Sequence, residues 1–213
     1  MLRRSALVLC LLVGHPAWSG PTQRYTCDVI PGPPVRVRVY RIAGHGRVRV
    51  GPELRYPRLG KMASAADVDA DGRLDLLVLV FKSTRFDRKP GWRPFVYTLG
   101  DGRWVPKWLG SRVGRPLVEA ALVHTPAGVR LLTIERFGKG RSGLTLYHWR
   151  GFGFRGEWTG PAMKSLSNLT VTDRDGDGID EIEAREQGGA RVRLTYAGRG
   201  YRPVSIGRKG GDR

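Results

Sequence analysis

The stretch "VRVRVYRIAGHGRVRV" (residues 35–50) alternates valine with arginine, reaches a tyrosine, passes a glycine-containing turn and alternates again. Alternation with a period of two is typical of a β-strand that has one buried and one solvated face. A short turn with glycine between two such strands predicts a β-hairpin, because glycine adopts the backbone angles that tight turns need. Residues 35–50 are therefore predicted to form an antiparallel pair of strands.

The same pattern returns three more times along the chain, and we call the four copies the outer hairpins. The further copies are "FVYTLGDGRWV" (95–105), "LTLYHWRGFGF" (144–154) and "VRLTYAGRGYRPV" (192–204). Each copy contains a tyrosine, and the four tyrosines are 57, 50 and 49 residues apart: Tyr40, Tyr97, Tyr147 and Tyr196. This regular spacing indicates an internal repeat.

A second kind of hairpin lies between the outer ones, and we call its copies the inner hairpins. They are "ASAADVDADGRLDLLVLVF" (63–81), "EAALVHTPAGVRLLTIE" (119–135) and "LSNLTVTDRDGDGIDEIEA" (166–184). Their turn glycines, Gly72, Gly128 and Gly178, are 56 and 50 residues apart, in step with the tyrosines. A repeat of about 50 residues with four strands fits one blade of a β-propeller.

The predicted fold is all-β, a β-propeller-like array of about three and a half four-stranded repeats. Three arrangements of the first outer hairpin stay open: it completes the last blade and closes a ring, it rests on residues 20–34, or it belongs to an incomplete, curled sheet. The predicted divisions are a signal peptide (1–19), an N-terminal extension (20–34), the β-repeat domain (35–206) and a disordered tail (207–213). Residues 82–93 are predicted to be an inserted basic loop.

The first twenty residues, "MLRRSALVLCLLVGHPAWSG", have the layout of a secretory signal. Two arginines precede a short apolar run, and small residues follow it, with a cleavage point after Ser19. The run is shorter than the roughly 20 apolar residues that span a bilayer. The sequence thus predicts a secreted or periplasmic protein without a transmembrane segment in its mature chain, with an uncleaved anchor as the alternative. Cys27 is then its one cysteine, so no internal disulfide is expected.

The chain is strongly basic, with a formal net charge of +18. Residues 1–19 carry two arginines and no acids, so the predicted mature chain keeps 35 bases and 19 acids, a net charge of +16. The bases alternate with apolar residues along predicted strands, which places them on solvated sheet faces. This charge predicts salt-sensitive attraction to anionic lipid, acidic glycan or nucleic acid. A specific nucleic-acid site is not favoured.

Two inner hairpins carry the same acidic turn, D-x-D-x-D-G-x-x-[DE]. Alternate carboxylates, a glycine at the bend and a backbone carbonyl at the seventh position suit Ca²⁺, which takes about six to eight oxygen ligands. Mg²⁺ is less suitable because it keeps several waters. An EF-hand is excluded, since the position of its closing glutamate holds Val78 or Ala184. The predicted ligands of two Ca²⁺ ions are Asp67, Asp69, Asp71, the Arg73 carbonyl and Asp75, and Asp173, Asp175, Asp177, the Ile179 carbonyl and Glu181.

With these loops between hairpins, and with "LYHWRGFGFRGEW" in an outer position, the chain resembles FG-GAP repeats, also called VCBS-type repeats. The resemblance covers roughly residues 35–206. It implies propeller blades as in integrin α subunits, with Ca²⁺ in inter-strand loops at the ligands already named. The middle unit departs from the pattern, because "LVHTPAG" has no carboxylate and no metal is expected there. "GPA" at 160–162 also stands where the family has Gly-Ala-Pro.

No set of catalytic residues is evident in the sequence. His45 and His124 are expected at the surface, because zinc would need further ligands that the sequence does not offer. His148 lies at or beside an outer-hairpin turn, and neither a serine nor Cys27 is placed beside a histidine and an acid. The sequence therefore predicts a binding or structural protein of unknown partner, a protein or glycan of the cell envelope being one possibility. The alternatives are a secreted metal-dependent hydrolase and a basic adhesin for acidic polymers or nucleic acid.

Five tryptophans fall in the predicted repeat domain: Trp92, Trp104, Trp108, Trp149 and Trp158. Exposed tryptophans on a repeat surface would suit stacking against sugars. Packing between blades is the favoured interpretation, because indole rings bury a large apolar area and their N–H needs a single acceptor.

Overall fold

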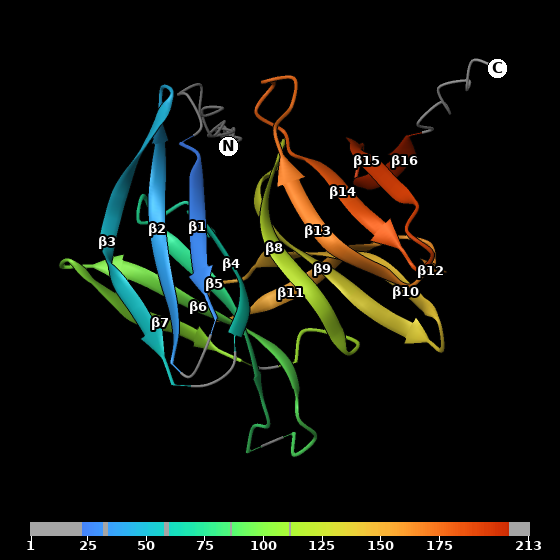
Figure 1. Cartoon of the computed structure of the whole chain (residues 1–213), viewed down its shortest axis with the longest axis horizontal. Helices are drawn as coiled ribbons and strands as arrows, with labels where there is room; N and C mark the ends of the chain where they lie inside the picture. The colour runs from blue at the N-terminus through green and yellow to red at the C-terminus, as the bar shows by residue number, and fades with distance from the viewer. Residues whose placement is uncertain (1–22, 32–33, 58–59, 86, 111, 205–213) are drawn as a thin grey trace, which may run out of the picture.

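The computed structural model describes residues 23–31, 34–57, 60–85, 87–110 and 112–204 (Figure 1). They form four small antiparallel sheets that are arranged as a four-bladed β-propeller. The prediction of an all-β, propeller-like fold is confirmed. Within these described ranges there is no helix that is long and apolar enough to cross a membrane. The predicted signal peptide and the predicted tail lie outside the described residues.

Each sheet is formed by strands that follow one another along the chain. The first sheet contains β1 (Tyr25–Ile30), β2 (Val35–Ala43) and β3 (Gly46–Tyr56). The second contains β4 (Gly60–Ala66), β5 (Asp75–Lys82), β6 (Gly91–Gly100) and β7 (Arg103–Leu109). The third contains β8 (Leu117–Thr125), β9 (Gly128–Gly138), β10 (Arg141–Trp149) and β11 (Phe154–Thr159), and the short β12 (Met163–Lys164) also pairs with β10. The fourth contains β13 (Leu166–Thr172), β14 (Glu181–Glu186), β15 (Arg191–Ala197) and β16 (Gly200–Val204).

The strand pairing reproduces the predicted inner and outer hairpins. The outer hairpins are β2–β3, β6–β7, β10–β11 and β15–β16, and the inner hairpins are β4–β5, β8–β9 and β13–β14. Three arrangements were left open for the first outer hairpin, and in the structure this hairpin rests on the segment that precedes it. Residues 20–34, which the sequence set apart as an extension, supply β1, and β1 pairs with β2 so that Cys27 lies opposite Val39. The first sheet therefore has three strands.

The four recurrent tyrosines do not occupy one equivalent place. Tyr97 and Tyr147 are buried and stand beside a β-bulge at the same point of their hairpins. Tyr40 is half-buried, and the Arg47 guanidinium lies 4.2 Å from the centre of its ring. Tyr196 is two residues before its turn, where its ring meets Tyr201 edge-on at 5.5 Å between ring centres. The repeat is thus followed most closely by the second and third sheets.

Hydrophobic clusters join the sheets in sequence, and each cluster draws on two neighbouring sheets. The boundary between the first and second sheets is filled by Val37, Val39, Leu76, Val78, Val80 and Phe95, among others. The boundary between the second and third contains Leu77, Leu79, Val96, Leu122, Leu131 and Tyr147. The boundary between the third and fourth contains Leu132, Ile134, Leu146, Ile182, Leu194 and Tyr201. Burial of apolar area at these three boundaries is the main source of stability.

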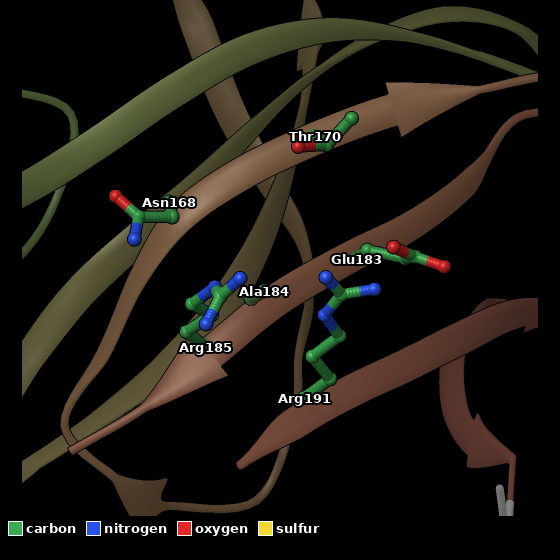
Figure 2. A pocket seen from close by; sticks show the side chains of 6 residues that line it. All are labelled: Asn168, Thr170, Glu183, Ala184, Arg185 and Arg191. Atoms are coloured by element: carbon green, nitrogen blue, oxygen red, sulfur yellow. The ribbon is translucent and has the colours of Figure 1, made fainter. Parts of the chain in front are cut away.

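The fourth boundary, between the fourth sheet and the first, is different, and we call it the open seam. None of the hydrophobic clusters formed by the described residues contains members of both sheets. β2 buries Val35, Val37 and Val39 toward the second sheet and turns arginines to its other face. β14 likewise buries Ile182 and Ala184, so its other face is polar; Figure 2 shows part of that face.

The tryptophans pack between sheets, as expected. Trp108 and Trp149 both meet the ring of Phe154 edge-on, at 5.3 and 5.2 Å between ring centres, beside the cluster that joins the second and third sheets. Trp158 packs against the cluster between the third and fourth sheets, and Trp104 against that between the first and second.

A core substitution at one of the three hydrophobic boundaries tests their role. Leu131 is fully buried in the cluster between the second and third sheets. We expect Leu131→Ala to lower the free energy of unfolding by about 2–5 kcal/mol, because it leaves a cavity that both sheets line. Denaturant unfolding followed by intrinsic tryptophan fluorescence measures this change. Phe152→Ala is the control, since Phe152 is 87% exposed and its removal is expected to change stability by about 0.5 kcal/mol or less. Equal unfolding midpoints for the two variants would contradict the assignment.

Candidate functional site

Two turns bring together the carboxylates that the sequence singled out. The first loop (67–75) connects β4 with β5, and the second loop (173–181) connects β13 with β14. In each loop one oxygen from each of three aspartates lies within 4.8 Å of the others; the triplets are Asp67, Asp69 and Asp71, and Asp173, Asp175 and Asp177. The two loops occupy equivalent places in the second and fourth sheets.

A glycine fixes the bend of both loops. Gly72 and Gly178 have φ values of +82° and +89°, in the left-handed region that residues with a Cβ rarely adopt. From this position the Gly72 amide donates to Asp67 Oδ2 at 2.8 Å, and the Gly178 amide donates to Asp173 Oδ2 at 3.2 Å. The first carboxylate of each loop is therefore oriented by a backbone amide of the same loop.

Two further hydrogen bonds recur in both loops at the same relative positions. Counted from the first aspartate of each loop, the backbone amide of residue seven donates to the carboxylate of residue five. The backbone amide of residue two donates to the carboxylate of residue nine. The bonds in question are Arg73 N to Asp71 (2.9 Å) and Val68 N to Asp75 (3.1 Å), and Ile179 N to Asp177 (2.7 Å) and Arg174 N to Glu181 (2.8 Å). The repeated sequence pattern thus folds into a repeated local structure, although the loops are far apart along the chain.

A lysine side chain lies among the carboxylates of the first loop. The Lys107 ammonium is 2.7 Å from Asp69 Oδ1, and 3.0 and 2.9 Å from the two carboxylate oxygens of Asp75. It is 4.0 Å from Asp71 Oδ2. A protein cation therefore compensates much of the negative charge of this loop.

A β-bulge directs Lys107 to this place. In the β6–β7 pair, Val96 lies opposite Trp108 and Tyr97 opposite Pro106, so Lys107 is an extra residue without a partner. Bulges turn one side chain out of the regular alternation, and they often do so beside functional sites. Here the bulge allows a residue on the outermost strand to reach a loop at the inner edge of the sheet.

The third sheet has the same bulge with the charges reversed. Glu157 is the extra residue of the β10–β11 pair, and its carboxylate lies 2.6 Å from Arg130 Nε. Arg130 precedes Leu131 on β9 as Asp75 precedes Leu76 on β5, and these leucines lie opposite Tyr147 and Tyr97. The turn of this sheet has no carboxylate triplet. At the bulge, the second sheet therefore has a base on the outer hairpin and an acid on the inner one, and the third sheet has the reverse.

Burial and hydrogen bonding act in opposite directions on the ion pair of the first loop. Burial raises the pKa of the Asp75 carboxyl above its ordinary value, since this side chain is shielded from solvent. Burial also disfavours the charge on Lys107, but hydrogen bonds to Asp69 and Asp75 outweigh it and raise the pKa of the ammonium. The ammonium donates to both oxygens of Asp75, so the contact has the geometry of a charge-assisted pair.

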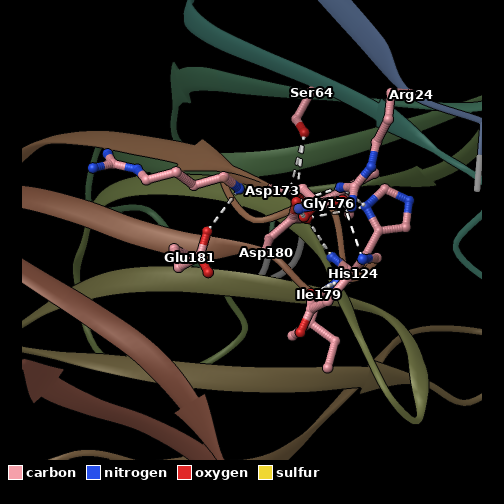
Figure 3. A network of polar contacts seen from close by, with 12 residues as sticks. Arg24, Ser64, His124, Asp173, Gly176, Ile179, Asp180 and Glu181 are labelled. Carbon is pink, nitrogen blue, oxygen red and sulfur yellow. Dashed lines mark hydrogen bonds and ion pairs between the residues drawn. The ribbon is translucent and has the colours of Figure 1, made fainter.

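The second loop is joined to two other sheets by a polar network (Figure 3). Arg24, immediately before β1, donates to Asp173 Oδ2 at 2.6 Å and also contacts Asp180. The His124 amide on β8 donates to Asp180 Oδ2 at 2.6 Å, and His124 Nδ1 is 3.0 Å from the same oxygen. The network thus links the beginning of the first sheet with the third and fourth sheets, across the open seam.

Asp180 is the centre of this network. Its side chain is 3% exposed, and burial alone would raise its pKa, but hydrogen bonds from His124 and the charge of Arg24 outweigh burial and lower the pKa. Tyr201 adds a hydrogen bond to the Asp180 backbone carbonyl at 3.0 Å. The buried carboxylate is therefore ionised and well supplied with donors, as a structural ion pair must be.

The structure places the predicted ligands in two groups. The six aspartates of the two triplets converge. The two closing carboxylates are engaged elsewhere, Asp75 by Lys107 and Glu181 by the Arg174 amide. Lys107, Arg24 and His124 contact carboxylates of the loops and were not predicted as site residues. Asp180, which lies within the second loop, was not predicted either. A signal for Asp180 was available, since an additional acid stands beside Glu181 where the first loop has Leu74.

The histidines differ from one another in their surroundings. His45 is exposed at the β2–β3 turn, as expected. His124 was also expected at the surface, but its side chain is only 16% exposed because Asp180 and Arg24 lie against it. The His148 side chain is 26% exposed, with Nδ1 3.9 Å from Glu157.

The two loops differ in how well they suit a divalent cation. In the second loop Asp175 and Asp177 form no ion pair with the other described residues, and only Asp173 is shared with Arg24. In the first loop the Lys107 ammonium lies where it competes with a metal for Asp69 and Asp75. Hard carboxylate oxygens from alternate residues are the donors that Ca²⁺ prefers. The second loop offers such an ion two aspartates without an ion pair among the described residues. The first loop offers its aspartates only if the Lys107 ammonium withdraws, and also the Arg73 guanidinium, which lies 2.8 Å from Asp71 Oδ2.

No family model, curated protein or solved structure matches this chain in the comparisons made. The class of protein that the structure shows is a four-bladed β-propeller.

The competition between Lys107 and calcium is testable. Lys107→Met removes the ammonium and keeps a similar length, so we expect the calcium affinity of the first loop to increase by about tenfold or more. Calorimetric titration in the Asp175→Ala background isolates the first loop. Lys139→Met is the control, because Lys139 is exposed at the β9–β10 turn and its variant loses the same charge. An unchanged affinity in Lys107→Met would show that the ammonium does not compete.

The network around Asp180 predicts a second effect, on stability. We expect Asp180→Ala to lower the free energy of unfolding by about 2 kcal/mol or more, because it leaves Arg24 and the His124 amide without their shared acceptor. Asp175→Ala removes an exposed carboxylate that pairs with no side chain of the described residues, so its effect is expected to be about 0.5 kcal/mol or less. Both measurements use a chelator, so that calcium does not contribute. Equal losses in the two variants would contradict a structural role for the network.

Proposed function

We propose that this chain is an exported, calcium-binding β-repeat module that acts by binding or supporting other macromolecules. The calcium is proposed to lie in the second loop and, more weakly, in the first. The resemblance to FG-GAP repeats is in keeping with this proposal. Export is proposed from the signal-like first nineteen residues.

One observation carries the proposal: the same carboxylate loop is built twice, with the same three backbone hydrogen bonds and equivalent positions in two sheets. Acidic turns that serve only as solvated connections do not need this repeated internal order. In each loop, backbone amides orient the aspartates at positions one and five. One oxygen from each of the three aspartates lies within 4.8 Å of the others.

The residues that would hold the ion are the three aspartates of each loop, the carbonyl at the seventh position and the carboxylate at the ninth. A bound Ca²⁺ would supply positive charge that fixes the turn between two strands. The chain's own residues perform the remaining work: the glycine permits the bend, and backbone amides orient the carboxylates. Such a role is structural, and it prepares the propeller surface for a partner.

A calcium titration tests this function. We expect the chain to bind two ions of unequal affinity and its Tm to rise with calcium, since a ligand that binds only the folded state stabilises it by about 2.7 kcal/mol at a hundredfold excess over Kd. Asp175→Ala is expected to lose the tighter ion, and Asp69→Ala the weaker one. The titration extends into the millimolar range that is typical of extracellular sites.

Glu186→Ala is the matched control for this titration, because it removes one carboxylate outside both loops. It is expected to keep both ions. If saturating calcium changes neither the Tm nor the heat of mixing, the loops are solvated turns and the metal proposal is wrong.

A further inference from the structure

We propose that the two polar sheet faces along the open seam form a binding surface for an acidic polysaccharide. This inference rests on the proposed function only for export, since it requires a partner outside the cell. Its physical basis is independent of calcium, because Arg185 and Arg191, the two arginines on which the test depends, lie outside both metal loops. The surface consists of the face of the first sheet that is turned away from the second sheet, and the face of the fourth sheet that is turned away from the third.

The face of the first sheet carries five arginines against two acids. Arg38 and Arg55 share Glu53 at 2.8 and 3.1 Å, and Arg47 contacts Asp28 at 2.7 Å. The Arg55 and Arg47 side chains remain 70% and 50% exposed. The five arginines of this face are Arg36, Arg38, Arg47, Arg49 and Arg55.

The face of the fourth sheet repeats this composition. Glu183 is shared by Arg174 and Arg193, at 2.6 and 3.1 Å, as Glu53 is shared in the first sheet. The arginines of this face are Arg174, Arg185, Arg191, Arg193 and Arg202, and its acids are Glu181 and Glu183. Because both faces have an excess of positive charge, they repel one another, which explains why the seam is not closed by packing.

In both faces two arginines stand directly opposite each other on neighbouring strands. The pairs are Arg36 with Arg55 and Arg185 with Arg191. Like charges in this position destabilise a sheet. Arg185 and Arg191 are exposed and form no ion pair with the other described residues. An anion between them would remove the repulsion, so the arrangement favours a negatively charged ligand over a purely structural role.

A shallow depression lies between these two arginines on the fourth sheet (Figure 2). Its volume is about 180 Å³, and it is lined by Asn168, Thr170, Glu183, Ala184, Arg185 and Arg191. The one acid of this lining, Glu183, already pairs with Arg174 and Arg193. This volume corresponds to about six waters at roughly 30 Å³ each. Two guanidinium groups, an amide and a hydroxyl can bind a carboxylate or sulfate together with a neighbouring sugar hydroxyl.

The chemistry of the surface favours a polysaccharide over nucleic acid. Single-stranded nucleic acid is bound with aromatic side chains on which its bases stack. Among the described residues of the two faces, Tyr40 is the aromatic ring that comes nearest to this role, and the Arg47 guanidinium already lies 4.2 Å from its centre. Arginines at alternate positions of a strand are about 7 Å apart. Such rows suit a linear polymer with regularly repeated anionic groups.

The test is binding of the full chain to polygalacturonate, in a buffer with chelator because this polymer itself binds calcium. We expect Arg185→Gln/Arg191→Gln to weaken binding by about tenfold, since it removes two charged donors from the depression. The matched control is Arg103→Gln/Arg150→Gln, which loses the same charge at exposed turns of the second and third sheets. It is expected to weaken binding by less than about threefold, as a general charge effect. Unchanged Tm values confirm that both variants fold.

Three outcomes would overturn the inference. Equal losses in the two double variants would reduce the binding to general charge attraction. Equal binding of polygalacturonate whose carboxylates are methyl-esterified would show that charge is not recognised. Tighter binding of a single-stranded oligonucleotide than of the acidic polymer would assign the surface to nucleic acid. A chain that binds the polymer but not calcium would contradict only the metal proposal, so the two failures are distinguishable.

Discussion

Small sheets of three to five strands cannot bury enough apolar area alone, so each depends on its neighbours, and this dependence organises the molecule. The second and third sheets are apolar on both faces: β5 is buried along nearly its whole length, because it lies between two other sheets. The first and fourth sheets are apolar on one face, as the alternation of β2 and β14 shows. They therefore end the row of packed sheets, and the boundary between them is left polar.

At the open seam, where no hydrophobic cluster of the described residues joins the two sheets, charged side chains make the contacts. Arg24 crosses the open seam at one end, where it meets Asp173 and the buried Asp180. Elsewhere along the seam the excess of arginine on both faces favours an external anion over contact between the sheets. The carboxylate loops and the arginine-rich sheet faces adjoin at Arg174 and Glu181, which belong to the second loop and also lie on the polar face of the fourth sheet.

The same bulge in the second and third sheets shows how one structural position acquires different chemistry. Lys107 and Glu157 are the extra residues of equivalent hairpins, and each reaches an opposite charge on the inner hairpin. In the second sheet that opposite charge belongs to a carboxylate loop, so the bulge residue also compensates part of the negative charge of that loop. In the third sheet the pair is only structural. A repeat therefore conserves geometry more strictly than it conserves charge.

The sequence by itself determined the strands, the inner and outer hairpins and the two carboxylate loops, because these depend on alternation, glycine turns and residues within nine positions of one another. It also contained the difference between continuous apolar strands such as "LLVLVF" (76–81) and alternating ones such as "VRVRVY" (35–40). Only the tertiary structure decided that residues 20–34 supply a strand of the first sheet, and that Lys107, Arg24 and His124 approach the acidic loops. Lys107 is 32 residues from Asp75, and Arg24 is 156 from Asp180. Such contacts depend on how the sheets pack and where a bulge falls, which no local pattern of residues reveals.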